Sequence, residues 1–191
     1  MNTVYFDNNA TTQVAAEVLE AMLPYFRDLY GNPSSMHTFG GQVGQKIRTA
    51  REQVAALIGA SSDEIIFTSC GSESDNTAIH SALATQPEKK HIITSRVEHP
   101  AIRALCAHLA TQGYRITELV VDKNGLLDLE NLEKSMTPDT AIVSLMWGNN
   151  ETGVIFPVEK AAAMAHERGI IFHTDAVQAA GKIPINLKNN A

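Results

Sequence analysis

The chain has 191 residues, a length that fits one domain or a large part of a larger one. Hydrophobic residues make up 44% of it and charged residues 19%, which is an ordinary balance for a globular protein with a substantial core. The formal net charge of −6, with no local cluster of Lys or Arg, argues against nucleic acid or an anionic membrane as a partner.

The first 60 residues differ in pattern from the rest, because their apolar residues repeat at helical spacing. We expect helices over residues 14–26 and 43–57, with a loop over 31–35 between them. Pro24 should kink the first helix, and Gly59 should end the second. We therefore separate an N-terminal helical segment, residues 1–60, from a second region, residues 61–191.

From residue 65 onward, short apolar strands alternate with helices. The expected strands are 65–69, 91–95, 116–121, 141–147 and 170–173, and a further strand is expected around Lys182. The expected helices are 73–83, one carrying Ile102 to Leu109, 128–136 and 158–168. This alternation indicates an α/β fold with a mostly parallel, doubly wound sheet flanked by helices.

The first polar strand exit is Cys70-Gly71-Ser72, directly before a helix. Ser72 to Asp75 matches the S-x-x-[DE] pattern that caps helix N-termini, so we expect the helix to begin there. A glycine beside a helix N-terminus leaves backbone N–H groups available for a phosphate. Many helices that bind nothing begin in the same way, so the pattern alone does not decide between the two.

The next exit is Glu98-His99-Pro100. Pro100 restricts His99 to extended backbone geometry, which fixes the direction of the imidazole. That ring could stack on an aromatic ligand or move protons near neutral pH. The alternative is a histidine on a turn with its polar end in water.

Two further exits carry amides and a carboxylate. Asn149 and Asn150 lie between glycines in a loop, where they serve either as amide donors to a ligand or as ordinary turn residues. Asp175 follows a buried strand and precedes Gln178 by three residues. Asp175 either caps a following helix or pairs with a protonated nitrogen, such as the ring nitrogen of pyridoxal 5′-phosphate (PLP).

All four exits point to one edge of the sheet, where α/β proteins bind ligands. Phosphate-binding N–H groups, a stackable imidazole, amides and a carboxylate together suit a phosphorylated, aromatic, nitrogen-containing cofactor. The sequence has neither the G-x-G-x-x-G motif of NAD-binding folds nor the G-x-x-x-x-G-K-[ST] motif of nucleotide hydrolases. The histidines lack the spacing of metal ligands, so we expect no metal site.

At these residues the sequence resembles the cysteine desulfurases, which are class V PLP enzymes of the aminotransferase fold type I, and within them the NifS type that serves nitrogenase. The resemblance spans essentially the whole chain. The matching segments are Tyr5–Thr12, Gly31–Ser35, Phe67–Asn76, Glu98-His99, Asn149–Gly153 and His173–Gln178.

The resemblance implies a role for each matching residue. Gly71 and Ser72 would hold the PLP phosphate, and His99 would stack on the ring and act in catalysis. Asp175 would pair with the ring nitrogen, while Asn150 and Gln178 would bond the phenolic oxygen. The substrate end of the cleft would be lined by Asn8, Ala10, Thr11, Asn32 and Asn150.

The resemblance also implies a reaction and partners. The family converts L-cysteine to L-alanine and passes the sulfur, carried as an enzyme persulfide, to an acceptor such as an iron–sulfur scaffold protein. It is homodimeric. Residues 1–60 would belong to the edge of the active site and to a small domain, and residues 61–191 would be the N-terminal portion of an incomplete PLP-binding large domain.

The chain departs from the family at one point, because three family residues find no match: the lysine that bonds to PLP, the nucleophilic cysteine and the arginine that binds substrate. Lys182 and Lys188 do not match the lysine motif, Cys70 belongs to the phosphate loop, and Cys106 falls on an apolar helix stripe. We therefore expect the isolated chain to be inactive and to self-associate through uncovered apolar surface.

Three hypotheses follow: the N-terminal part of a cysteine desulfurase; a related class V enzyme such as a selenocysteine lyase; or a non-catalytic, truncated remnant. The cellular setting is expected to be a reducing cytoplasm. The two cysteines lack disulfide-framework or C-x-x-C spacing, and Met1 is followed by neither a signal peptide nor an apolar span.

Overall fold

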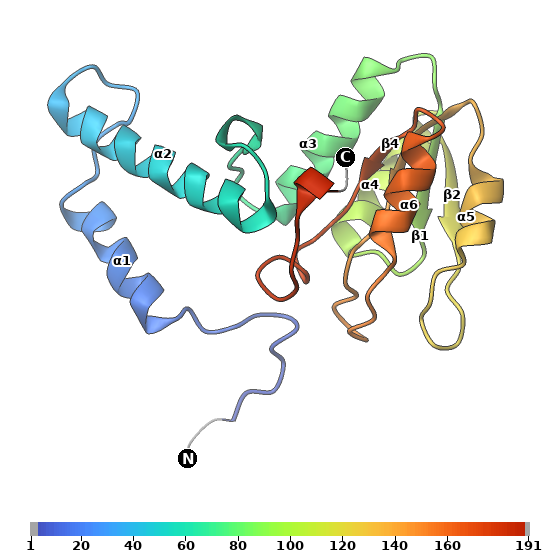
Figure 1. Cartoon of the computed structure of the whole chain (residues 1–191), viewed down its shortest axis with the longest axis horizontal. Coiled ribbons are helices and arrows are strands. Elements are labelled where there is room, and N and C mark those ends of the chain that lie inside the picture. The colour runs from blue at the N-terminus through green and yellow to red at the C-terminus, as the bar shows by residue number, and fades with distance from the viewer. Residues whose placement is uncertain (1–3, 190–191) are drawn as a thin grey trace. The chain divides into compact units, whose positions relative to one another are not determined.

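The computed structural model describes residues 4–189, and the chain divides into two compact units (Figure 1). The first unit runs to Ile66 and includes Ile185–Leu187, and the second begins at Phe67 and contains the sheet. The assignment of residues 1–60 and 61–191 to a small and a large domain stays a prediction.

The first unit consists of helices joined by a tight loop. Its elements are α1 (Ala16–Arg27), α2 (Thr38–Ile58) and the short 3₁₀ helix η1 (Ser62–Glu64). Pro24 lies inside α1, which continues past it to Arg27, and Gly59 ends α2 with a left-handed φ of 69°. A side chain at Gly40 would come within 2.3 Å of the Asn32 carbonyl oxygen, so the loop before α2 requires glycine there. Both predicted helices and the loop are confirmed.

The second unit is built on a four-stranded parallel sheet. The strands are β1 (His91–Ser95), β2 (Arg115–Leu119), β3 (Thr140–Ser144) and β4 (Ile171–His173), and their order across the sheet is β2-β1-β3-β4. The helices are α3 (Gly71–Thr85), α4 (Pro100–Thr111), α5 (Leu129–Ser135) and α6 (Val158–His166), and η2 (Leu187–Asn189) closes the described chain.

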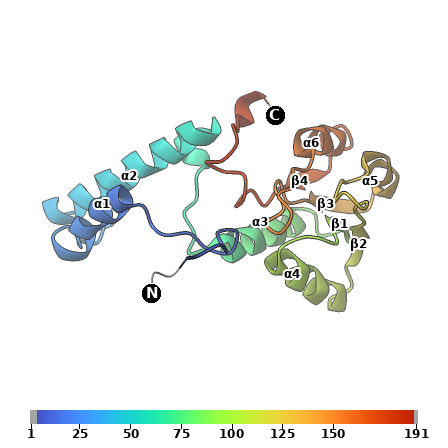
Figure 2. The same cartoon turned by 90° about the horizontal axis from the view of Figure 1, so that it is seen from below.

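Helices cover both faces of this sheet. The paired helices α3 and α4 lie on one face, and α5 and α6 lie on the other (Figures 1 and 2). The strands β1 and β3 are buried along their whole length, since each touches a helix layer on both sides. The doubly wound, mostly parallel sheet predicted from the sequence is confirmed.

Two predicted strands are wrong. Residues 65–69 are not part of the described sheet, and the Ile65 carbonyl oxygen accepts a hydrogen bond from the Arg51 side chain rather than from a neighbouring strand. Ile66 is 78% exposed. The segment around Lys182 is a turn, because its N–H donates to the Ala179 carbonyl oxygen at 2.9 Å. Apolar residues alone do not make a strand, which needs a partner for its backbone groups.

Among residues 4–189, no helix is both long and apolar enough to cross a membrane.

Candidate active site

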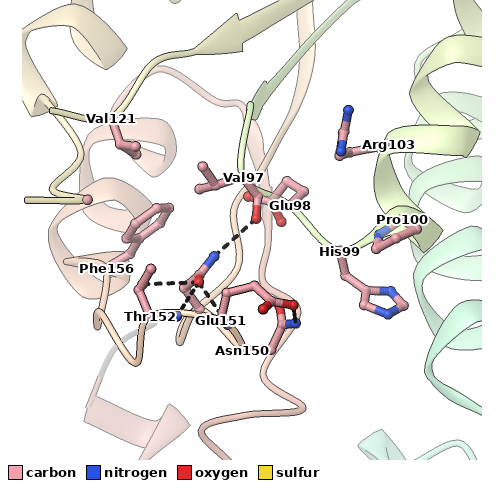
Figure 3. A pocket seen from close by; sticks show the side chains of 12 residues that line it. Val97, Glu98, His99, Pro100, Arg103, Val121, Asn150, Glu151, Thr152 and Phe156 are labelled. Carbon is pink, nitrogen blue, oxygen red and sulfur yellow. Dashed lines mark hydrogen bonds between the residues drawn. The ribbon is translucent and has the colours of Figure 1, made fainter. Parts of the chain in front are cut away.

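The sheet order places a ligand-binding crevice between β1 and β3. The chain leaves β1 toward α4 on one face and leaves β3 toward α6 on the opposite face, so the two exits diverge. Such a switch point is where open α/β sheets bind ligands. A cavity of about 380 Å³ opens there (Figure 3). Its wall includes Val97, Glu98, His99, Pro100, Arg103, Asn149, Asn150, Glu151, Thr152 and Phe156.

Glu98 is the buried acid of this crevice, with only 4% of its surface exposed. Its Oε1 accepts hydrogen bonds from the Ser95 hydroxyl at 2.5 Å and from the Met146 N–H at 3.0 Å. Burial raises the pKa of this carboxyl to about 7. Glu98 belongs to the strand exit Glu98-His99-Pro100, but no role was predicted for it. The available signal was its position, a carboxylate at the end of a fully buried strand.

His99 caps helix α4. Its φ of −56° and ψ of 147° give the extended geometry predicted from Pro100, and its Nδ1 accepts the Ala101 N–H at 3.2 Å. In the neutral ring the proton therefore sits on Nε2. Figure 3 shows the His99 and Glu98 side chains extending apart, although they are neighbours in sequence. His99 itself is exposed, so its ring is accessible to a ligand.

The two asparagines after β3 differ in role: one is a turn residue, and the other faces the cavity. Asn149 is buried, donates to the Val97 carbonyl oxygen at 3.2 Å, and accepts from Glu151 and Thr152 through Oδ1. It is a turn residue that joins the exits of β1 and β3. Asn150 faces the cavity, and its amide donates to the Glu151 carboxylate at 2.9 Å.

Helix α3 begins one residue before Ser72, so the predicted cap at Ser72 is wrong. Cys70 is the N-cap, Gly71 is the first helical residue, and the Glu73 carboxylate reaches back to the Ser69 N–H at 2.6 Å. Asp75 is buried and cannot serve a cap. Gly71 and Ser72 still lie in the first turn, where N–H groups lack partners within the helix.

A buried polar chain joins α3 to the sheet. Asp75 Oδ1 lies 3.5 Å from His173 Nε2, and His173 Nδ1 lies 2.9 Å from the Ser144 hydroxyl. The three residues come from α3, β4 and β3. The contact fixes the helix end that carries Gly71 and Ser72 relative to the strand that leads to Asp175.

Asp175 and Gln178 lie beside the other exits. The Asp175 carbonyl oxygen accepts the Trp147 N–H at 2.9 Å, which extends the β3–β4 pairing, and its Oδ1 accepts the Val177 N–H at 3.0 Å. Turns, and no helix, occupy residues 177–182 after Asp175, so the helix-cap alternative is wrong. Gln178 packs near Gly148 and accepts a hydrogen bond from Lys182.

The predicted cofactor residues therefore lie in one unit. Gly71 is adjacent to Val177, where an added Cβ would meet Val177 Cγ2 at 3.4 Å, so the α3 N-terminus adjoins the segment carrying Asp175 and Gln178. The predicted substrate residues, Asn8, Ala10, Thr11 and Asn32, belong to the other unit and are not buried. Their role stays a prediction.

The two thiols differ in environment. Cys106 is buried on α4, and burial raises the pKa of its thiol to about 11, as fits the inert core residue expected there. Cys70 is exposed, and the Glu73 N–H and the Ser69 hydroxyl lower the pKa of its thiol. Within the described residues, no group of three or more His, Cys, Asp and Glu side chains could hold a metal ion.

Residues 4–190 match the model of the class-V aminotransferase family. The chain belongs to this family. It is 60% identical over 190 residues to a cysteine desulfurase of Trichormus azollae, covering 100% of this chain and 48% of that protein. It is 57% identical over 192 residues to the cysteine desulfurase NifS of Azotobacter vinelandii, with the same coverage. The chain spans about half the length of the curated relatives it matches.

Solved structures agree with this assignment. A NifS-like protein superposes with a TM-score of 0.94 at 42% identity, covering 98% of this chain and 52% of the other. A structure described as SspA in complex with cysteine gives a TM-score of 0.94 at 38% identity, covering 98% and 55%. The predicted fold type I, with a parallel sheet between helices, is therefore confirmed for the portion that this chain represents.

Proposed function

We propose that this chain is the N-terminal part of a PLP-dependent cysteine desulfurase. The enzyme would convert L-cysteine to L-alanine and pass the sulfur to an acceptor for iron–sulfur cluster assembly, with nitrogenase clusters as one destination. The main support for this proposal is the 60% identity to a cysteine desulfurase. The matched region covers the whole chain and therefore spans every strand exit described above.

The donor set at the sheet edge fits PLP. A doubly charged phosphate suits a helix N-terminus, and Gly71 and Ser72 occupy the first turn of α3. A protonated pyridine nitrogen suits a carboxylate, and Asp175 stands at the exit of β4. Gly71 adjoins Val177, so the first turn of α3 and the Asp175 carboxylate border the same segment. When bound, PLP would supply an electron sink for cleavage of bonds at the substrate α-carbon.

The other side chains would bind and orient. His99 would lie against the ring, and its Nε2 would hold or release a proton at the face where substrate arrives. Asn150 and Gln178 would donate amide N–H groups to the phenolic oxygen. The Lys182 bond uses the Oε1 of Gln178, and the Glu151 bond uses one of the two N–H groups of Asn150. Asn8, Ala10, Thr11 and Asn32 would line the substrate end. A homodimer, a scaffold protein as sulfur acceptor and a cytoplasmic location complete the proposal.

A chimera tests this proposal. Residues 1–191 are joined to the second half of the Azotobacter vinelandii relative, and PLP content and alanine release from L-cysteine are measured. We expect a PLP-containing protein that releases alanine, while the 191-residue chain alone releases none. His99→Ala should reduce the rate by about 100-fold or more, since proton transfer by a positioned histidine contributes at least that much.

Glu88→Gln is the matched control, because Glu88 is exposed and distant in sequence from every strand exit. A folded chimera that takes up no PLP would overturn the cofactor proposal. A chimera that binds PLP and releases no alanine or sulfide from L-cysteine would overturn the assignment of substrate.

A further inference from the structure

Glu98 is not among the residues proposed to touch the cofactor, although it is the most deeply buried acid at the crevice. We propose that Glu98 is a positioning residue that carries a proton on Oε2, so that it adds no negative charge beside Asp175. The part that concerns Asp175 rests on the proposed function. The protonation of Glu98 itself does not.

The hydrogen bonds of Glu98 fit a neutral carboxylic acid. Oε1 accepts from both Ser95 and Met146, as the carbonyl oxygen of a neutral acid can. Burial raises the pKa of the carboxyl by more than these two bonds lower it. Oε2 is buried, and within residues 4–189 it has no hydrogen-bond partner. An ionised carboxylate would leave a buried, unpaired charge on that oxygen, which is far more costly than a buried O–H group.

The nearby charges act on Glu98 in opposite directions. The groups that act electrostatically on Glu98 are Asp175, which favours its protonated form, and His173, which opposes it. Cys106, on α4, is also coupled to it. His99, Arg103 and Glu151 share the cavity wall. Two nearby carboxylates in a site of low polarity cannot both ionise easily, and Asp175 is the less buried of the two.

A neutral Glu98 would also position the site. Its Oε1 bridges Ser95, at the end of β1, to Met146, two residues beyond β3, and Trp147, one residue further, donates to the Asp175 carbonyl oxygen. The acid therefore holds the two sides of the switch point together while adding no charge. An apolar residue at this position could not accept the hydrogen bonds from Ser95 and Met146, which explains why an acid is buried here.

The test compares Glu98→Gln and Glu98→Ala with Glu88→Gln in the 191-residue chain. Glutamine keeps an acceptor oxygen for Ser95 and Met146 and places an N–H₂ group where the acid carries its proton. We expect Glu98→Gln to match the parent in unfolding midpoint near pH 4, where the parent carboxyl is protonated, and to exceed it at pH 7, where the parent must take up a proton on folding. Glu98→Ala should fall below the parent near pH 4. A Glu98→Gln variant as unstable as Glu98→Ala would contradict the proposal, because it would show that the site requires an ionised carboxylate.

Carbon-13 NMR of labelled glutamate side chains supplies the second readout. The Glu98 carboxyl signal, assigned by its loss in Glu98→Gln, should titrate with a midpoint near 7, and Asp175→Asn should move that midpoint to lower pH. A Glu98 midpoint near that of free glutamate would overturn the proposal. An unchanged midpoint in Asp175→Asn would overturn the coupling to Asp175. Neither readout requires PLP, so both remain decisive if the cofactor proposal fails.

Discussion

At the scale of the residue, the adjacent amides of Asn149 and Asn150 should contribute very differently to stability. Asn149→Ala removes a buried donor to Val97 and the acceptor shared by Glu151 and Thr152. We expect the free energy of unfolding to fall by about 1–3 kcal/mol, since buried groups are left unsatisfied. Asn150→Ala should change it by less than about 0.5 kcal/mol. Urea unfolding of both variants measures this difference. Equal losses of unfolding free energy would contradict the different roles assigned to Asn149 and Asn150.

His91 should give the protein an acid-sensitive stability. It is fully buried, with its two ring nitrogens 2.8 Å from the hydroxyls of Thr140 and Thr117, and burial lowers its pKa to about 4. The unfolded chain binds this proton first, so the free energy of unfolding should fall as pH drops from about 6.5 to 4, by at most roughly 3 kcal/mol.

The raised pKa of Glu98 has the opposite sign, because the folded state holds that proton more tightly. Its contribution is present below about pH 4.5 and is lost as pH rises toward 7. The two slopes partly cancel in the parent chain. Unfolding measured from pH 4 to 7 should therefore show a steeper acid loss in Glu98→Gln and a shallower one in His91→Gln. Superimposable pH curves for the three proteins would exclude this assignment.

At the scale of the element, the contact between Asp75 and His173 should fix helix α3 against the sheet. Both side chains are largely buried, at 7% and 14% exposure. His173→Gln removes the partner of a buried carboxylate, so we expect a loss of about 1–3 kcal/mol in unfolding free energy and faster amide exchange in the first turns of α3. Glu130→Gln, which breaks an exposed ion pair with Lys134, should cost less than about 1 kcal/mol. Unchanged exchange in α3 would contradict the proposed role.

The sequence predicted correctly the elements whose apolar pattern is enough to define them. It failed where an element also needs a neighbouring strand to pair with its backbone. The strand 91–95 and the helix carrying Ile102 to Leu109 were predicted from their apolar pattern and are confirmed. Their apolar side chains are buried within the same α/β unit. The segment 65–69 has the same apolar pattern, but a strand also needs a neighbour. The apolar pattern of a sequence indicates which side chains are buried, but it does not show which groups the backbone N–H and C=O bond to.

The candidate site shows the same division. The strand exits predicted Asp175, His99 and Asn150 as site residues, because position after a buried strand is visible in the sequence, and their roles stay predictions. Glu98, Asp75 and His173 received no such role from the sequence. Asp75 meets His173 only when α3 packs against β4, and Glu98 gains its two hydrogen bonds only when the chain beyond β1 packs against the chain beyond β3. Ser72 and Asp75 fit a capping pattern by spacing, yet tertiary contact with His173 assigns Asp75 elsewhere.

At the scale of the whole molecule, the first unit leaves much apolar surface uncovered. Helix α1 has no buried residue, although one stripe of it is apolar. Val18 and Leu19 are each 50% exposed, Leu23 is 45% exposed and Phe26 is 75% exposed. Contiguous apolar surface of this kind marks an interaction site or a tendency to aggregate.

We therefore expect the 191-residue chain to self-associate in a concentration-dependent way, as measured by sedimentation velocity. Leu19→Glu combined with Phe26→Glu should weaken association at least about tenfold, because each charge would have to be desolvated in an interface. Gln42→Glu with Gln53→Glu, at exposed polar positions of α2, adds the same two negative charges, so it is the matched control and should associate as the parent does. A parent chain that stays monomeric across the concentration range would show that the apolar stripe of α1 does not mediate self-association. An equal effect of the control would show instead that net charge, rather than the apolar stripe, governs association.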